Sequence, residues 1–360
     1  MSASVHLAGV VLPEGEHRDV WIRDGRITFE PVPGAETVSR DGWLVPGLVD
    51  AHCHVGIGRG GRPVEDLAGL REQALTERYA GVLALRDCGS PVDTRALDDE
   101  PDLPRIIRAG RHIARTRRYI PGLGIEVEPQ ELADEVRVQA RRGDGWVKLV
   151  GDWIDRGAGD LAPSFPAAAV RDAVSAAHDE GARVTAHCFG EGTLDDMLDA
   201  GIDCIEHATG LLPRHIPRFV EQQVPIVPTL INIATFPDIA ARAESKFPRY
   251  AAHMRGLWER RNERVLEAYE AGVQIFAGTD AGSVIGHGRI ADEILALHAA
   301  GLPAVAALDA ACWSARRWLE ADGLAEGASA DVVLCSEDPR SDPETIRDLK
   351  SVVLRGKIVR

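Results

Sequence analysis

The sequence predicts an α/β fold, a (β/α)8 barrel of the TIM type, with a small β-sandwich domain beside it. Three observations predict this fold. The middle of the 360-residue chain repeats a unit in which a helical segment ends in glycine and a short apolar strand follows. A polar or charged residue closes most of these strands. Both ends of the chain instead contain strand-like runs with weak helical periodicity.

Strand-like runs near the two ends predict one small β-domain built from both termini. Separated by turn signals, these runs are residues 5–12, 19–31, 331–339 and 349–360. We predict that residues 1–45 and 319–360 together form the β-sandwich. Residues 46–318 would then form the barrel domain, inserted between the two halves of the small domain.

The central segment contains about eight strand-like runs, which is the number that a TIM barrel requires. One of its helices can be interpreted closely, because Leu194, Met197 and Leu198 share a helical face and Gly201 ends the helix. An open, doubly wound sheet is the alternative. The barrel is favoured because polar residues close so many strands, and barrel enzymes place catalytic groups at the C-terminal ends of strands.

Composition excludes several classes of function. The chain has 41 basic and 56 acidic residues, a net charge of −15, which argues against a nucleic-acid surface. Its six cysteines are scattered singly, which argues against a thiolate metal site or a disulfide framework. No signal peptide or long apolar run is evident. We expect a cytoplasmic protein that acts on a small molecule, without nucleic-acid or membrane partners; a second copy of the chain is a candidate partner.

His52 and His54 follow an apolar run that would deliver them to the end of a strand. Residues two apart on a strand project to the same side, so the two imidazoles converge on one point. By itself this spacing is a weak signal for a metal. Asp50 projects to the same side, either as a group that orients a ligand or as a buried carboxylate satisfied by backbone amides.

Two further histidines, His187 and His207, close consecutive predicted strands. A single histidine in such a place is more often structural, but four imidazoles at adjacent strand ends favour a zinc-like ion. Asp280 closes a later strand. It is interpreted as a carboxylate that touches metal and accepts a proton from the attacking water, with a helix N-cap as the alternative.

Lys148 lies within an apolar strand-like run, residues 146–150. Burying an ammonium group is costly, so this lysine is either ion-paired or snorkelling, or it is chemically active. Desolvation lowers the pKa of a lysine and gives a nucleophilic amine. Such an amine can capture CO2 as an anionic carbamate, which is able to bridge two cations.

Over essentially the whole chain, this pattern resembles the amidohydrolase superfamily. The residues that carry the resemblance lie on the first, fourth, fifth, sixth and eighth strands: His52, His54, Lys148, His187, His207 and Asp280. The motifs GRHIA after the third strand, and GTDAGS and HGR after the eighth, are similar to those of the imidazolonepropionase-related, Xaa-Pro dipeptidase-like branch.

The resemblance implies a site with two divalent metals, expected to be zinc, bridged by carboxylated Lys148. One metal would also bind His52, His54 and Asp280, and the other would bind the two remaining histidines. The implied activity is hydrolysis of a C–N bond in an amide, dipeptide or cyclic amide by a metal-activated water. Asp280 would accept the proton of that water and return it to the leaving amine.

Three other functions stay open. A lactone or ester hydrolase would use the same site. A mononuclear deaminase of this superfamily usually has Glu two or three positions after the fifth-strand histidine, where Phe189 and Gly190 stand here, and lacks Lys148. A non-catalytic barrel scaffold would not need all six ligand positions filled. Metal content of about two, one or no ions per chain distinguishes the binuclear hydrolase, the deaminase and the scaffold.

Candidate substrate-binding residues lie in the loops that follow strands: Arg117, Tyr119, Trp153, Asn232 and His287. An arginine binds a carboxylate in bidentate fashion, although a solvated surface arginine is the alternative. His287 is also a candidate catalytic residue, because it lies just beyond Asp280. Phe189 stands where dipeptidase-like relatives often carry an aromatic hydroxyl, so that means of recognising a carboxylate is missing.

Overall fold

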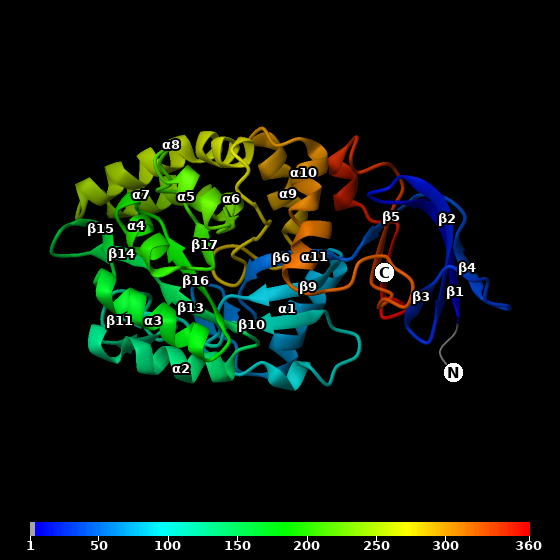
Figure 1. Cartoon of the computed structure of the whole chain (residues 1–360), viewed down its shortest axis with the longest axis horizontal. Coiled ribbons are helices and arrows are strands. Elements are labelled where there is room, and N and C mark those ends of the chain that lie inside the picture. The colour runs from blue at the N-terminus through cyan, green and yellow to red at the C-terminus, as the bar shows by residue number, and fades with distance from the viewer. Residues whose placement is uncertain (1–3) are drawn as a thin grey trace.

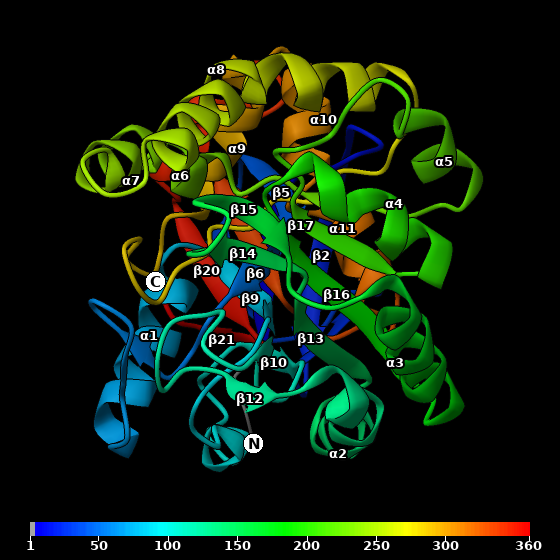
Figure 2. The same cartoon turned by 90° about the vertical axis from the view of Figure 1, so that its left-hand side faces the viewer.

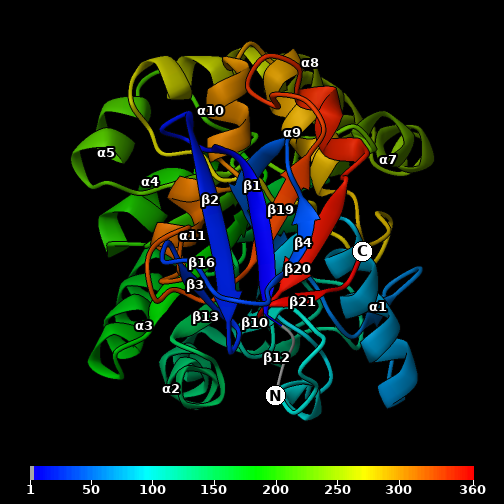
Figure 3. The same ribbon diagram turned by 90° about the vertical axis from the view of Figure 1, so that its right-hand side faces the viewer.

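Strands from both ends of the chain form one mixed, eight-stranded sheet in the computed structural model, which describes residues 4–360 (Figure 1). The strands are β1 (Val5–Val11), β2 (Glu16–Arg23), β3 (Arg26–Thr28), β4 (Glu36–Ser39), β5 (Trp43–Pro46), β19 (Val332–Cys335), β20 (Ser351–Leu354) and β21 (Lys357–Ile358). Their order is β21-β20-β19-β5-β1-β2-β3, with β4 paired to β1. Figure 3 shows this sheet face on.

The pairing of β5 with β19 joins the two ends of the chain. It is antiparallel, from Val332 opposite Pro46 to Cys335 opposite Trp43. Leu44 of β5 is fully buried in an apolar cluster with residues of both termini. The prediction that the termini meet in one β-structure is confirmed, and their arrangement as a sandwich stays a prediction.

The central strands are parallel and lie in two sheets. They are β6 (Leu48–Cys53), β9 (Val82–Asp87), β10 (Arg105–Arg108), β11 (Ile113–Arg115), β12 (Ile125–Val127), β13 (Trp146–Val150), β16 (Arg183–Cys188), β17 (Cys204–His207) and β18 (Ile226–Val227). One sheet has the order β10-β9-β6 and the other β12-β11-β13-β16-β17-β18. Every residue of β6, β9, β13 and β17 is buried, as expected for parallel strands covered on both faces.

The last predicted strand, residues 273–277, is not a regular strand. It belongs to an extended segment held by backbone hydrogen bonds and isolated bridges. Ile226 of β18 exchanges two hydrogen bonds of 3.0 Å with this segment. Ala51 and His52 of β6 make two more, of 2.9 and 2.8 Å. The segment therefore links an edge of one parallel sheet to an edge of the other.

Helices surround the parallel strands, as Figure 2 shows. They are α1 (Leu67–Tyr79), α2 (Leu132–Arg142), α3 (Ala167–Asp179), α4 (Glu191–Ala200), α5 (Ile216–Glu221), α6 (Leu230–Ile233), α7 (Phe236–Ala243), α8 (Pro248–Glu270), α9 (Ile290–Ala299), α10 (Ala304–Asp309) and α11 (Trp313–Trp318). In α4, Leu194, Met197 and Leu198 are buried, and Gly201 ends the helix at a φ of 80°, as predicted. Within residues 4–360, no helix combines the length and apolar character that crossing a membrane requires.

A hairpin of β14 (Asp152–Asp155) and β15 (Asp160–Pro163) is fixed to the helical layer by His253 of α8. The His253 Nδ1 atom lies 2.8 Å from Asp160 Oδ1, and Nε2 lies 2.8 Å from Glu191 Oε2 of α4. The hydrogen bond with Glu191 raises the pKa of His253 to about 9; partial burial opposes this shift and Asp160 adds to it. The contact positions the hairpin that carries Trp153.

We predict that the loss of these ion pairs at alkaline pH lowers the stability of the fold. The pKa of His253 rises from 6.5 to about 9 on folding, so its contribution is complete below pH 6.5 and is lost as the pH passes through 9. Between pH 7 and 10, the Tm of the natural chain should fall more than that of His253→Gln. We expect a difference of roughly 1–2 °C, small because these charges are partly exposed and solvent screens them. Equal falls, measured by circular dichroism, would contradict this role.

Candidate metal centre

Three ligand atoms already converge at the end of β6. The Nε2 atoms of His52 and His54 lie 3.2 Å apart, and each lies 3.0 Å from Oδ1 of Asp280. In a tetrahedral zinc site with metal–ligand distances of about 2.0–2.1 Å, neighbouring ligand atoms are about 3.3 Å apart. The three atoms therefore have about the spacing of ligands around one ion.

Hydrogen bonds of the Nδ1 atoms orient two of the imidazole rings. The Nδ1 atom of His54 donates to the carbonyl oxygen of Gly89 at 2.9 Å, which leaves the lone pair of Nε2 for a cation. The Nδ1 atom of His207 lies 2.7 Å from Thr229 Oγ1. Burial lowers the pKa of His52 to about 3, so this ring is neutral at pH 7, as a metal ligand must be.

The other predicted ligands lie beside this group. The ring centroids of His187 and His207 are 4.7 Å apart, and those of His52 and His207 are 5.2 Å apart. The buried Nε2 atom of His187 has no hydrogen-bond partner within residues 4–360. A buried polar atom without a partner is costly, so a cation at this place fits the residues present. Lys148 is only 2% exposed.

Four residues at this end of the strands adopt a left-handed backbone although none is glycine. The φ angles of His207, Ala208, Thr229 and Asp280 are 65°, 50°, 49° and 56°. Such a conformation costs about 1–3 kcal/mol per residue and persists only where the surroundings enforce it. The fold therefore maintains strain where the candidate ligands are presented.

A cavity of about 150 Å³ opens over these groups. All six predicted ligands line it, and so do three of the predicted substrate-binding residues: Tyr119, Trp153 and Asn232. The side-chain amide of Asn232 donates to Asp280 Oδ2 at 2.7 Å. No helix begins directly after Asp280, since α9 starts only at Ile290, so the N-cap alternative is wrong.

Two predicted residues do not line the cavity. Arg117 is exposed to solvent. His287 is buried, and its Nδ1 atom lies 2.8 Å from Oε1 of Glu77 of α1. The same carboxylate oxygen accepts from Gly288 N at 3.1 Å, which holds the loop after Asp280. A contact between His287 and substrate stays a prediction that the geometry does not favour.

Asp50 behaves as the structural carboxylate that was one of its two interpretations. Its Oδ1 atom accepts from the backbone N–H groups of His52 and Thr279, at 3.0 and 3.1 Å. Its Oδ2 atom accepts from Thr279 Oγ1 at 2.5 Å. These bonds tie β6 to the extended segment that presents Asp280.

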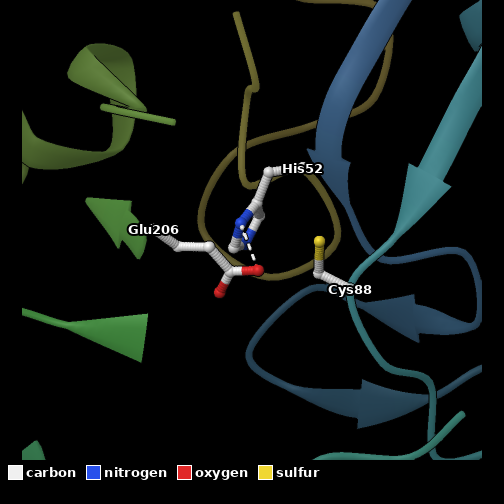
Figure 4. Close-up of side chains that lie close together, drawn as sticks. All are labelled: His52, Cys88 and Glu206. Atoms are coloured by element: carbon white, nitrogen blue, oxygen red, sulfur yellow. Dashed lines mark ion pairs between the residues drawn. The ribbon is translucent and has the colours of Figure 1, made fainter. Parts of the chain in front are cut away.

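Glu206 is a charged residue beside the candidate ligands that the sequence analysis missed. It is fully buried, and its Oε2 atom contacts Nζ of Lys148. Its Oε1 atom lies 2.8 Å from Thr185 Oγ1 and 3.3 Å from His52 Nδ1 (Figure 4). The sequence did contain a signal for Glu206. A glutamate in an apolar, buried strand needs a partner of opposite charge, just as Lys148 does.

Cys88 also approaches His52 and Glu206, and Figure 4 shows the three side chains together. Burial raises the pKa of the Cys88 thiol to about 12, so it stays protonated and is a poor ligand. Neither Cys88 nor Glu206 lines the cavity, whereas His52, His54 and Asp280 do. We therefore assign the ligand role to the latter three.

Comparison with known proteins identifies the family. The model of the Amidohydrolase family matches residues 43–359, and the chain belongs to this family. The uncharacterized protein Rv2915c of Mycobacterium tuberculosis is 55% identical over 354 residues, which cover 98% of this chain and 95% of that protein. The resemblance inferred from the ligand pattern is confirmed.

Solved structures confirm the architecture. A Xaa-Pro dipeptidase with bound methionine in the active site has a TM-score of 0.83 and 21% identity, covering 99% of this chain and 100% of that chain. The ochratoxinase of A. niger has a TM-score of 0.80 and 20% identity, with coverages of 100% and 96%. At these identities the likeness shows the fold, which is of the TIM-barrel α/β type. Membership of the family makes the chain a hydrolase.

We predict that Glu206→Gln weakens metal binding without unfolding the chain. Gln keeps the shape and the bond to Thr185 but removes the charge that faces Lys148 and His52 Nδ1. Loss of such a group behind a ligand typically costs about 10–100-fold in metal affinity. Zinc titration calorimetry measures this change.

Glu180→Gln is the control for that measurement. Glu180 pairs with Arg141 and does not line the cavity, so this variant removes a carboxylate charge without touching the candidate ligands. Zinc affinity should be near that of the natural chain. Equal affinity of the Glu206→Gln and natural chains would contradict the role given to Glu206.

Proposed function

We propose that this chain hydrolyses a C–N bond, with water activated at a site of two divalent metals bridged by a carboxylated Lys148. The observation that carries the proposal is the convergence of all six predicted ligands on one cavity. The family supports hydrolysis in general. We also propose that residues 46–318 form a closed (β/α)8 barrel, and that residues 1–45 and 319–360 form the β-sandwich.

The residues present suit two cations. His52, His54 and Asp280 would hold one of them, and His187 and His207 would hold the other. Neutral imidazoles with a carboxylate favour zinc among the divalent metals. Bound cations would supply Lewis-acid polarisation of the scissile carbonyl and of the attacking water.

Lys148 would become the bridge by reaction with CO2. Burial lowers the pKa of its amine to about 8, so part of it is neutral near pH 7. CO2 adds to the neutral amine, an N–C bond forms and one N–H proton is released. The carbamate and Asp280 would then contribute two negative charges beside the cations, while Glu206 stays paired with the buried Arg86, 3.6 Å away.

Two contacts of Asp280 support a role in proton transfer. Oδ1 faces the imidazole pair, and Oδ2 accepts from Asn232 at 2.7 Å, which fixes the plane of the carboxylate. From this position it would accept the proton of the attacking water and deliver it to the leaving amine. A hydrolase of lactones or esters would use the same groups.

A site with one metal, as in deaminases, is the second candidate. One observation favours it: the three-ligand group of His52, His54 and Asp280 is compact, while Lys148 contacts Glu206. Such a site would leave the lysine as an ammonium group and the other histidines without a metal.

A hydrolysis screen tests the proposed reaction. Zinc-loaded chain is incubated with dipeptides, N-acyl amino acids, neutral amides, cyclic amides and lactones, and product amine or acid is quantified. Turnover of at least one amide is expected, and kcat of Asp280→Asn should be lower by about 10²–10⁴-fold with an unchanged circular dichroism spectrum. Turnover of lactones alone would contradict the C–N assignment, and a normal rate for Asp280→Asn would remove the proton-transfer role.

We predict that Lys148→Ala is inactive and partly rescued by short carboxylic acids. The substitution removes the carbamate, and a carboxylate such as acetate or propionate is able to occupy its place. Activity should fall by about 10²-fold or more and recover in part with millimolar acid, as measured on the best substrate of the screen.

Lys246→Ala, a substitution of an exposed lysine, is the control for this experiment and should behave as the natural chain. Full activity of Lys148→Ala, or stimulation of both variants by the acids, would contradict a bridging role.

A further inference from the structure

The cavity over the candidate metal centre is walled mainly by apolar side chains. These side chains include Ile120, Leu123, Trp153, Phe189, Phe236 and Ile239. Phe189 packs at 4.8 Å, edge to face, on Phe236 and lies 4.1 Å from the ring of His187, centroid to centroid. An aromatic wall thus stands directly beside a candidate ligand.

The part of the chain that the structure describes gives the cavity no unpaired lysine or arginine side chain. Lys148 is the only lysine or arginine that lines the cavity within residues 4–360, and its Nζ atom contacts the buried carboxylate of Glu206. Asp280 contributes a negative charge on the same floor. A substrate carboxylate would therefore meet no unpaired cationic side chain here and would have a carboxylate nearby.

The two arginines that precede Tyr119 do not supply the missing cation. Arg117 is exposed and lies outside the cavity. Arg118 is engaged in structure: it donates from Nη1 to Asp155 Oδ2 at 2.8 Å, and from Nη2 to the carbonyl oxygens of Trp153 and Ala162, at 3.1 and 2.9 Å. It holds the β14–β15 hairpin in place and is not free to clamp a substrate.

We propose that the substrate is a small, uncharged amide with an aromatic or branched aliphatic flank, and not a dipeptide or an N-acyl amino acid with a free carboxylate. This inference rests on the proposed function and narrows it. An ionised carboxylate that is buried beside apolar walls pairs with no cationic side chain there, so the free-energy cost of losing its hydration is not offset. An uncharged apolar flank instead binds more favourably when it leaves water. The cavity of about 150 Å³ limits the flank to a small group, with larger parts extending past the exposed rim at Val284.

A matched pair of compounds tests this. N-(2-hydroxyethyl)-2-phenylacetamide and N-phenylacetylglycine have nearly the same size and the same scissile bond, and only the second has a carboxylate. Their kcat/KM values are measured with zinc-loaded natural chain, and their Kd values with metal-free natural chain, which keeps the charge of Asp280 and does not turn the compounds over. The uncharged compound should be favoured by at least about tenfold in both measurements.

A substitution at the rim provides the converse test. Val284 is 65% exposed, so a longer side chain fits there without repacking the core. Val284→Arg places a guanidinium group at the cavity mouth, and Val284→Gln adds similar bulk without charge. Relative to Val284→Gln, Val284→Arg should tighten binding of N-phenylacetylglycine by about three- to tenfold and leave the uncharged compound nearly unchanged.

The outcomes separate the inference from the proposed function. Equal or better use of N-phenylacetylglycine by the natural chain, or no measurable binding of the uncharged compound, overturns the inference and leaves C–N hydrolysis standing. Absence of hydrolysis for every amide of the wider screen overturns the proposed function. A preference for the uncharged compound in Kd would still be expected in that case, because it depends on the cavity walls.

Discussion

The fully buried carboxylate of Glu206 on β17 is the anion around which this end of the parallel strands is organised, because Lys148 Nζ contacts it and the fully buried Arg86 lies 3.6 Å from it. Arg86 keeps the carboxylate paired whether Lys148 is an ammonium or a carbamate, which limits the cost of burying its charge. Neutral imidazoles of the candidate ligands lie near this carboxylate. They offer lone pairs to a cation but carry no negative charge that would neutralise it. The polar groups at these strand ends thus converge on one place that suits positive ions.

Hydrogen bonds from neighbouring residues keep these groups in place. Asp50 bonds to the backbone of both β6 and the segment before Asp280, which fixes these two segments to each other. Thr229 and the carbonyl oxygen of Gly89 orient imidazoles from two further loops. Left-handed backbone at strand ends aims the side chains into the cavity. Stability of the outer strands and helices offsets this local strain.

The candidate ligands were predictable from the sequence because four histidines and Asp280 follow or close apolar runs and Lys148 lies within one, and a fold of the TIM-barrel type brings strand ends together. Glu206 was missed because the neighbouring His207 accounted for the polar strand end, although a buried lysine on one strand already required an anion on another. His287 was overestimated, since nearness in sequence to Asp280 says nothing about Glu77, which lies 210 residues away and holds it. Cavity walls depend on loops whose course no periodicity specifies.

The number of metal ions bound per chain tests the central claim most directly. The chain is reconstituted with zinc in bicarbonate buffer, freed of loose metal on a desalting column, and analysed by plasma mass spectrometry against protein concentration. A centre bridged by Lys148 predicts about two ions per chain, because two sets of ligands share the bridge. One ion per chain would contradict the bridged centre, and none would contradict a metal site altogether.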